Sequence, residues 1–276
     1  MRLFITIFFL QLLLSCGNVN NTKPVQAHID TVKAKNDKIA ADEEFTVNIA
    51  ALLKDSRAWY NYTYYNVKLS QDFIGLDVDS TSIDKATFLN KLLTGDVIAF
   101  KTRLVQGKPV YKLYKFASVD EDIKATSKQL ASIEKRNDGI EGQQLPAYTF
   151  ADLNGATYTP ASTKGKILVL KCWFIHCVAC VQEFPSCNKL VEENEENKHL
   201  LFLSLAIDTK QQLSAFLKTK PFKYAVVPNM EDYMTDKLNI GEYPTHLLVD
   251  KTGKIIKVVN TIEELVPFLT KEIAKQ

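Results

Sequence analysis

Two cysteines separated by two residues, Cys177 and Cys180, restrict the fold and chemistry of this chain more than any other feature. The pair follows an apolar, strand-like run at Ile167–Phe174 and precedes a helical run at Gln182–Leu190. At a helix N-terminus, free backbone N–H groups and the helix dipole stabilise a cysteine as the reactive thiolate. We therefore expect Cys177 to be the attacking thiol and Cys180, one turn deeper, to resolve the mixed disulfide.

Two other interpretations of the cysteine pair stay open. The pair could be half of a zinc site, although a zinc site needs two more ligands at suitable spacing and the sequence offers none nearby. It could also be a purely structural disulfide. Redox exchange is favoured because the pair lies between a strand and a helix.

Beyond Gly142 the chain alternates strand-like runs with helical stretches, which is typical of an α/β sheet. The strand-like runs are Ile167–Phe174, Leu200–Ile207 and His246–Val249. We predict an α/β domain over residues 143–276.

The segment from Trp173 to Pro185 resembles the W-x-x-x-C-x-x-C-x-x-E-x-P signature of the TlpA/ResA-like thiol-disulfide oxidoreductases, which are membrane-tethered bacterial proteins. The similarity extends over Gln143–Gln276 and includes a hairpin at Leu145–Thr159 that this family adds before the core sheet. The resemblance implies a thioredoxin-like C-terminal domain with a central mixed sheet flanked by helices. It also implies an enzyme of the protein-disulfide reductase type that needs no metal and no cofactor besides its redox-active disulfide.

A second motif, Tyr243-Pro244-Thr245, opens the last predicted strand. The resemblance implies that Pro244 is cis and faces the dithiol, and that Tyr243 offers backbone groups to an extended substrate strand. A cis bond before proline costs only about 0.5–1 kcal/mol over trans. The alternative is an ordinary trans proline. With Thr245, Trp173 and His176, these residues form the substrate-binding set that we expect.

Glu183 lies one helical turn after Cys180 and on the same side of the helix. The resemblance implies that Glu183 accepts the proton of the resolving cysteine. Burial raises the pKa of a carboxylic acid, which would let Glu183 exchange a proton in the neutral range. The alternative is a solvated glutamate that the helix dipole favours.

The chain departs from the pattern of its relatives beside the cysteine pair. A cationic His176 would lower the pKa of Cys177, but His176 could equally be an exposed loop residue. Lys171 stands where thioredoxin has a buried aspartate, so residue 171 does not deprotonate the resolving cysteine. We expect Cys172 and Cys187 to be buried and not to pair directly with the active dithiol, with a redox relay through Cys187 as a minor alternative.

The N-terminus has the pattern of a secretion signal. After a basic start, Leu3–Leu14 is almost wholly apolar, and at about 12 residues it is shorter than the roughly 20 that span a bilayer. The run ends in Leu-Leu-Ser-Cys, which resembles the lipobox of bacterial lipoproteins. The resemblance implies that Cys16 is lipidated and anchors the chain on the periplasmic side of a membrane. The alternative is a cleaved secretory signal with an incidental cysteine.

Between a polar tether at residues 17–43 and the redox domain, residues 44–118 predict a small α+β domain of unknown function. We expect a strand at Trp59–Leu69, whose aromatic residues could bind a peptide or simply pack. The other expected elements are a helix at Ser82–Leu93 ended by Gly95, and strands at Val97–Val105 and Val110–Phe116.

A linker helix is predicted at residues 119–142, between the two domains. Ser118 and Glu121 have the spacing of a capping box, and Gly139 is positioned to close the helix.

The length of 276 residues suits two domains. With 34 basic and 32 acidic side chains, the net charge of +2 gives no electrostatic reason to expect a nucleic acid partner. The resemblance implies a reductant of disulfides in exported, cysteine-containing proteins, which receives electrons from a membrane thiol donor. A disulfide oxidant or isomerase, or a non-catalytic lipoprotein interaction module on a thioredoxin scaffold, are the alternatives.

Overall fold

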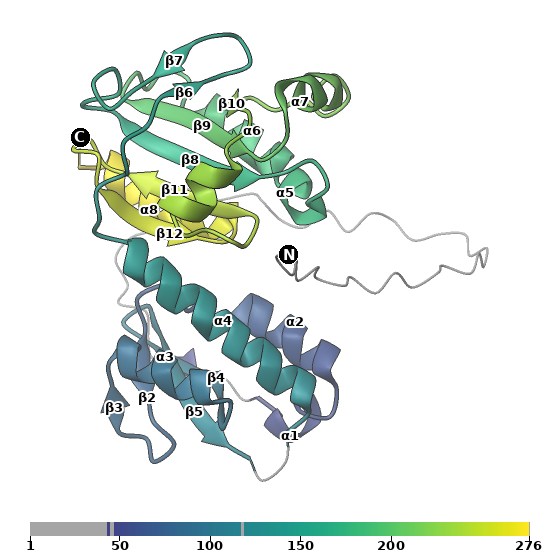
Figure 1. The fold of residues 1–276 in the computed structure, drawn as a ribbon. Coiled ribbons are helices and arrows are strands. Elements are labelled where there is room, and N and C mark those ends of the chain that lie inside the picture. Colours follow the sequence, from purple (N-terminus) through teal and green to yellow (C-terminus); the bar gives the residue numbers. More distant parts are fainter. Residues whose placement is uncertain (1–42, 45–46, 117–118, 276) are drawn as a thin grey trace, which may run out of the picture. The chain divides into compact units, whose positions relative to one another are not determined.

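The computed structural model describes residues 43–44, 47–116 and 119–275 (Figure 1). The signal sequence, the lipobox cysteine Cys16 and nearly all of the tether expected at 17–43 lie outside the described residues. Within the described part, no helix is both long and apolar enough to cross a bilayer.

The N-terminal domain contains a five-stranded sheet with the strand order β1-β4-β5-β2-β3. Strands β2 and β5 are parallel, and the other neighbours are antiparallel. The strands are β1 (Glu43–Glu44), β2 (Ile74–Leu76), β3 (Ser82–Ile83), β4 (Val97–Val105) and β5 (Lys108–Lys115). The predicted strands at Val97–Val105 and Val110–Phe116 are thereby confirmed, the second beginning two residues earlier.

The aromatic segment that was expected to form a strand is a helix, α2 (Ser56–Asn66), preceded by the short α1 (Ile49–Leu52). Asp55 caps α2 by accepting hydrogen bonds from the N–H groups of its first turn. Trp59 and Thr63, four residues apart, are buried, while Tyr60, Tyr64 and Tyr65 are exposed. The prediction was wrong because the β-propensity of these residues is weaker than the cap and the helical spacing of the buried pair.

Helix α3 (Lys85–Thr94) confirms the predicted helix but begins three residues later. Ser82 and Ile83 pair with β2 instead, and Asp84 caps the helix through the N–H of Thr87. Gly95 ends the helix in the left-handed conformation, with φ of 79°.

Helix α4 (Glu121–Ile140) is the linker helix, and Asp120 is its N-cap. Ser118, expected to form a capping box with Glu121, lies outside the described residues. It continues past Gly139, so the expected stop at that glycine was wrong. Ile123 packs with Trp59 in the core of the N-terminal domain, whereas Ile140 packs with Leu145 in the core of the C-terminal domain. The helix therefore belongs to both cores.

The C-terminal domain has a mixed five-stranded sheet with the order β10-β9-β8-β11-β12. Strands β8, β9 and β10 are parallel to one another, and β11 is antiparallel to both β8 and β12. The strands are β8 (Ile167–Trp173), β9 (Leu200–Ala206), β10 (Ala225–Val227), β11 (Thr245–Val249) and β12 (Ile255–Val259). A small hairpin of β6 (Phe150–Ala151) and β7 (Thr157–Tyr158) precedes this sheet, as expected. The thioredoxin-like arrangement predicted for this half is confirmed.

Both faces of this sheet are covered, which explains why its central strands are wholly buried. On one face, Ile167 and Val169 pack with Cys187 and Leu190 of α6 (Phe184–Glu193) and with Leu265 of α8 (Ile262–Ile273). The opposite face packs against the segment around η1 and the end of α4. The remaining helices are α5 (Val178–Gln182), α6 (Phe184–Glu193), α7 (Lys210–Phe216), the π-helix η1 (Tyr233–Lys237) and α8 (Ile262–Ile273).

The helical run after the cysteine pair is divided in two at Glu183. Pro185 lies in the first turn of α6, where its missing N–H costs no hydrogen bond. The helical run is therefore broken between α5 and α6, and the break places the side chain of Glu183 at the junction.

Candidate active site

The two cysteines lie where strand β8 passes into helix α5, and they are joined as a disulfide. Cys177 is the N-cap residue of α5, and its Sγ accepts a hydrogen bond from the N–H of Cys180 at 3.2 Å. Cys177 is 8% exposed, whereas Cys180 is completely buried. A substrate sulfur can therefore reach Cys177 and not Cys180, which agrees with the attacking and resolving roles expected for them.

The surface beside Cys177 is partly apolar. Val178, the next residue, is 70% exposed. Ile175, in the loop before the dithiol, is held in place because its N–H donates to Asp208 Oδ2 at 2.8 Å. An exposed aliphatic side chain next to an accessible sulfur suits a protein substrate better than a charged small molecule.

The Tyr243–Pro244 peptide bond is cis, as the resemblance implied. Pro244 directly precedes β11, and Thr245 pairs in register with Cys172 on β8. Asn260 binds this turn by donating to the carbonyl oxygen of Pro244 at 3.1 Å. The proline thus lies beside the C-terminal end of β8, from which the cysteine loop leaves the sheet.

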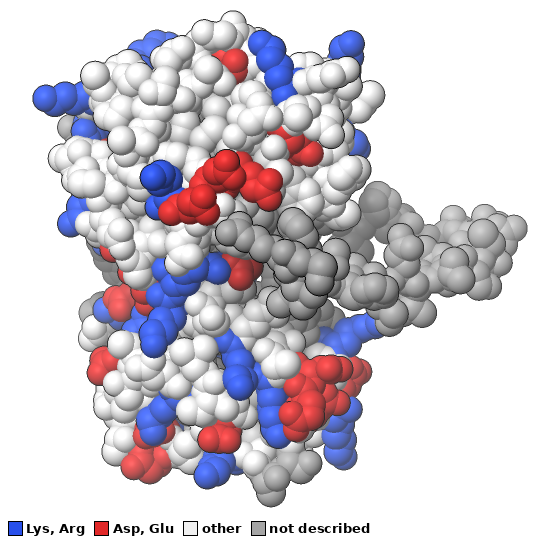
Figure 2. Space-filling model, viewed as in Figure 1, with Lys and Arg blue, Asp and Glu red and all other residues white. Residues whose placement is uncertain are grey.

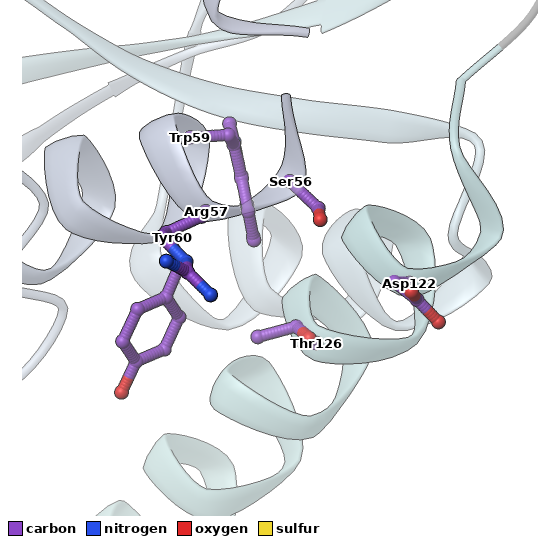
Figure 3. Close-up of a pocket in the computed structure, with 6 residues that line it drawn as sticks. All are labelled: Ser56, Arg57, Trp59, Tyr60, Asp122 and Thr126. Atoms are coloured by element: carbon purple, nitrogen blue, oxygen red, sulfur yellow. The ribbon is translucent and has the colours of Figure 1, made fainter. Parts of the chain in front are cut away.

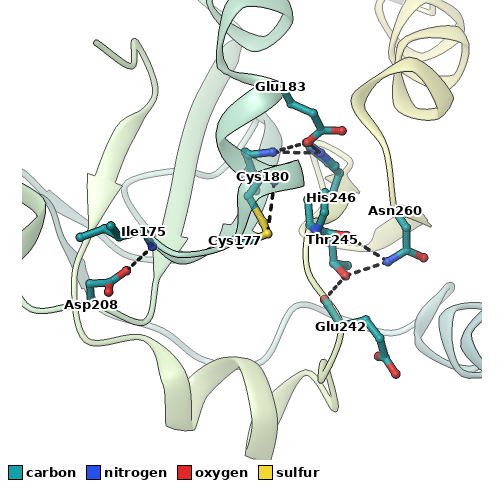
Figure 4. Close-up of a disulfide and its surroundings, with 11 residues drawn as sticks. Ile175, Cys177, Cys180, Glu183, Asp208, Glu242, Thr245, His246 and Asn260 are labelled. Carbon is teal, nitrogen blue, oxygen red and sulfur yellow. Dashed lines mark hydrogen bonds and ion pairs between the residues drawn. A yellow bond between two sulfur atoms is a disulfide. The ribbon is translucent and has the colours of Figure 1, made fainter. Parts of the chain in front are cut away.

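Glu183 is surrounded by partners rather than by water. Its Oε2 forms an ion pair with Lys171 and lies 3.0 Å from Nε2 of His246, and its Oε1 accepts from the N–H of Ile262 at 2.8 Å. Figure 4 shows Glu183 and His246 meeting next to the helical turn that carries Cys180. The alternative of a solvated glutamate is excluded by these contacts.

The charge state of Glu183 differs from the expected one. Burial raises its pKa, but the neighbouring His246 and Lys171 lower it by more, so that the net shift is downward. Glu183 is therefore a carboxylate throughout the neutral range, and the expectation of a raised pKa was wrong because the two partners were not foreseen.

Comparison with known proteins gives relatives of the C-terminal domain. Residues 141–258 match the AhpC/TSA family. Thiol-disulfide oxidoreductase ResA of Bacillus cereus is 27% identical over 133 residues, which are 47% of this chain and 77% of that protein. Thioredoxin-like protein YneN of Bacillus subtilis is 29% identical over 124 residues, which are 44% of this chain and 72% of that protein.

These relatives and the strand–dithiol–helix arrangement agree on the chemistry of the C-terminal domain. The C-terminal domain is a thiol-disulfide oxidoreductase domain similar to those of the TlpA/ResA-like proteins. Among solved structures, the thioredoxin domain of a thiol-disulfide oxidoreductase from Bacteroides vulgatus aligns over 48% of this chain and 96% of its own, with 22% identity and a TM-score of 0.43. The family match begins at residue 141 and does not include the N-terminal domain.

Two residues expected to bind substrate lie beneath the oxidoreductase surface instead. Trp173 is completely buried, and its ring packs edge-on against Phe184 at a centroid distance of 4.9 Å. Thr245 is also completely buried, and its hydroxyl donates to the carbonyl oxygen of Glu242 at 2.7 Å. Both therefore support the site from below. The sequence did not reveal this because a motif does not show which side chains reach the surface.

Two other expected substrate residues remain accessible. His176 is exposed in the loop directly before Cys177, as the exposed-loop alternative held. Tyr243 is half-buried, and its ring lies edge-on to that of Phe174 at 5.5 Å. These two side chains flank the dithiol loop and the cis-proline turn.

The other two described cysteines are buried and do not pair with the dithiol, as predicted. Cys172 and Cys187 are buried and free, and burial raises the pKa of each thiol to about 12. So high a pKa leaves almost no thiolate at neutral pH and disfavours a relay through Cys187.

The N-terminal domain contains a separate open hollow of about 240 Å³ between α2 and α4. Figure 3 shows Trp59 and Tyr60 of α2 on one side and Asp122 and Thr126 of α4 on the other. The residues that line this hollow include no cysteine. In the described part of the chain, no group of three or more histidine, cysteine or acidic side chains is arranged to hold a metal ion.

Proposed function

We propose that this oxidoreductase reduces disulfides in exported proteins while it is lipid-anchored through Cys16 on the periplasmic side of a membrane. The observation that carries the proposal is the unequal exposure of the two cysteines: Cys177 is 8% exposed next to the exposed Val178, and Cys180 is completely buried. One accessible sulfur and one protected sulfur suit an exchange in which the client is bound and then released.

The exchange proceeds in two displacements. The Cys177 thiolate attacks one sulfur of the client disulfide, and the other client sulfur leaves as a thiolate. Cys180 then loses its proton and attacks Sγ of Cys177, which releases the first client sulfur and closes the Cys177–Cys180 disulfide. The N-cap position of Cys177 favours its thiolate form, because free N–H groups of the helix face the sulfur.

The partners follow from this cycle. Because each turnover leaves the dithiol oxidised, a thiol donor must restore it, and we propose a membrane thiol protein for this step. Figure 2 shows Lys and Arg side chains interspersed with Asp and Glu side chains over the face in view, in keeping with the net charge of +2. Such a surface suits protein partners and not nucleic acid.

The first experiment is the reduction potential of the Cys177–Cys180 pair, measured in detergent-solubilised protein by equilibration with glutathione or dithiothreitol. A value near that of thioredoxin, roughly −270 mV, would support a reductant. A value near roughly −120 mV would overturn that direction and favour an oxidant or isomerase. A pair that never equilibrates would point to a non-catalytic interaction module.

The anchor is tested separately by Cys16→Ser in the full chain. We expect the wild-type protein to fractionate with membranes and to incorporate labelled fatty acid, and the variant to incorporate none. Equal labelling of the two proteins would contradict lipidation at Cys16 without affecting the redox assignment.

A further inference from the structure

Three charged or polar side chains meet in the apolar interior of the thioredoxin-like domain. Lys171 on β8 and His246 on β11 are both completely buried, and the two residues pair directly across the strands. Each is the only charged or titratable polar residue of its strand, apart from the thiol of Cys172. Burying such groups is costly unless they interact, so their meeting with Glu183 calls for an explanation.

The geometry fixes where the protons of this cluster lie. The Oε2 atom of Glu183 can only accept hydrogen bonds, and it lies 3.0 Å from Nε2 of His246. Nε2 must therefore carry a proton and donate it. The Lys171 Nζ, at 3.4 Å from Nε2, then contacts the imidazole without bonding to it and pairs with Glu183 instead.

The other imidazole nitrogen is left as a bare acceptor. Nδ1 of His246 is buried and has no hydrogen-bond partner among the described residues. With the proton on Nε2, Nδ1 carries a lone pair that nothing in this part of the chain occupies. A buried, oriented lone pair of this kind is a base.

The surroundings keep this base unprotonated at rest. Burial and the charge of Lys171 lower the pKa of His246, and they outweigh Glu183 and the more distant Glu264 of α8, which raise it. Glu264 is itself ion-paired with Lys68 at 3.1 Å. The imidazole is therefore neutral at pH 7, and Lys171 and Glu183 balance each other.

We propose that His246 takes up the proton of Cys180 when Cys180 resolves the mixed disulfide, and that Glu183 and Lys171 act as positioning residues for the imidazole. In this step the Cys180 S–H bond breaks and its proton comes to rest on Nδ1. The sulfur of Cys180 bonds to Sγ of Cys177, whose bond to the client sulfur breaks. The client leaves as a thiolate with the electron pair of that bond.

Charge balance supports this route. A thiolate formed at the buried Cys180 would be an uncompensated charge unless a positive charge appears nearby at the same time. Transfer to His246 creates an imidazolium next to the Glu183 carboxylate, so the interior stays neutral while the sulfur attacks. Glu183 cannot serve as well, since its lowered pKa makes it a weak base.

The assignment does not depend on the direction of electron flow. Cys180 must lose a proton whenever the internal disulfide closes and regain it when the disulfide opens. His246 would therefore exchange this proton in a reductant and in an oxidant alike. The proposed role of His246 is wrong only if the proton of Cys180 is transferred to another group.

The test follows the resolving step by itself. The full chain carrying Cys16→Ser is purified in detergent, reduced and mixed with 5,5′-dithiobis(2-nitrobenzoate) in stopped flow between pH 5.5 and 9. Attack by Cys177 releases the first aromatic thiolate, and the later, concentration-independent release of the second reports attack by Cys180. Wild-type release should level off in the neutral range, where His246 is already neutral.

The deciding variant is His246→Gln, because the glutamine Nε2 can still donate to Glu183 but the side chain has no base. We expect the second release to slow roughly 100-fold at pH 7, to rise about tenfold per pH unit and to approach the wild-type rate near pH 9. The first release should be unchanged. A second release with the wild-type rate and pH profile would overturn the proposal.

Lys257→Met is the matched control, since Lys257 is a buried lysine of the same sheet that pairs with Glu141 at 2.7 Å. This variant removes an equivalent ion pair away from the dithiol, and its release profile should match the wild type. A shift as large as that of His246→Gln would mean that general destabilisation causes the effect.

A second measurement needs no variant. The ¹⁵N shifts of the His246 ring in the oxidised wild-type protein should show a neutral imidazole with the proton on Nε2 at pH 7. A charged ring, or a proton on Nδ1, would overturn the assignment.

Discussion

At the scale of single residues, the two cysteines of the dithiol differ in their exposure to solvent. Replacing either cysteine by serine should therefore stop the exchange at a different step. Cys180→Ser leaves the surface sulfur able to attack but removes the group that releases the client. We expect this variant to accumulate a stable mixed disulfide, seen by mass spectrometry under non-reducing conditions. Cys177→Ser should form none, because Cys180 is completely buried. Comparable adducts in both variants would contradict the assigned roles.

Because the pKa of Glu183 is lowered in the folded state, we expect the free energy of unfolding to depend on pH. Its folded pKa lies below the unfolded value of about 4.3, so the unfolded state binds the proton more readily. The stabilisation is therefore complete above about pH 5 and is lost as the pH falls through 4.3 towards the folded pKa. At pH 7, Glu183→Gln should lower the free energy of unfolding by about 3–5 kcal/mol, since Lys171 stays buried without its counter-ion.

Urea unfolding at pH 7, 5 and 3.5 checks this prediction, and the difference between variant and wild type should shrink at the lowest pH. Glu193→Gln serves as the control, because the Glu193–Lys189 pair is exposed on α6 and should contribute no more than about 1 kcal/mol. A constant difference at all three pH values would show that Glu183 stabilises the fold by packing alone.

At the scale of elements, two glycines of similar appearance in the sequence should respond in opposite ways to alanine. Gly95 ends α3 at φ of 79°, where a side chain costs about 1–2 kcal/mol, and its new Cβ would lie 2.9 Å from Cδ of Lys128. Gly139 lies within α4 with open space around it, so alanine there should stabilise by about 0.5–1 kcal/mol. Thermal unfolding of both variants measures the signs, and equal signs would contradict the assignment of Gly139 to the helix.

The elements also show which parts of the fold could be predicted from sequence. The β8–dithiol–α5 arrangement, the hairpin of β4 and β5 and the glycine stop after α3 all follow from local patterns. Helix α2 was missed because its buried Trp59 and Thr63 were hidden among tyrosines that favour strands. The His246–Glu183–Lys171 cluster was missed because it joins three segments far apart in the chain, and only a polar residue in each of two apolar strands hinted at it.

At the scale of the whole molecule, α4 contributes to the cores on both sides of it, through Ile123 and through Ile140. We therefore expect residues 47–275 to unfold in one cooperative transition. The chain has two tryptophans, Trp59 in the first core and Trp173 in the second. Trp59→Phe and Trp173→Phe each leave one fluorescent reporter, and in each variant the fluorescence and circular dichroism midpoints in urea should coincide. Separate midpoints would show that the domains unfold independently.

Because the two residues between the cysteines are exposed, the redox properties of the Cys177–Cys180 couple can be changed by substitution. Val178 and Ala179 both lie at the surface, while Cys177 is only 8% exposed and Cys180 is completely buried. Replacing this dipeptide changes the charge and hydrogen bonding around Cys177 without disturbing any packed side chain. Natural selection, or a protein engineer, can therefore retune the redox couple by editing two codons while the scaffold beneath it keeps its stability.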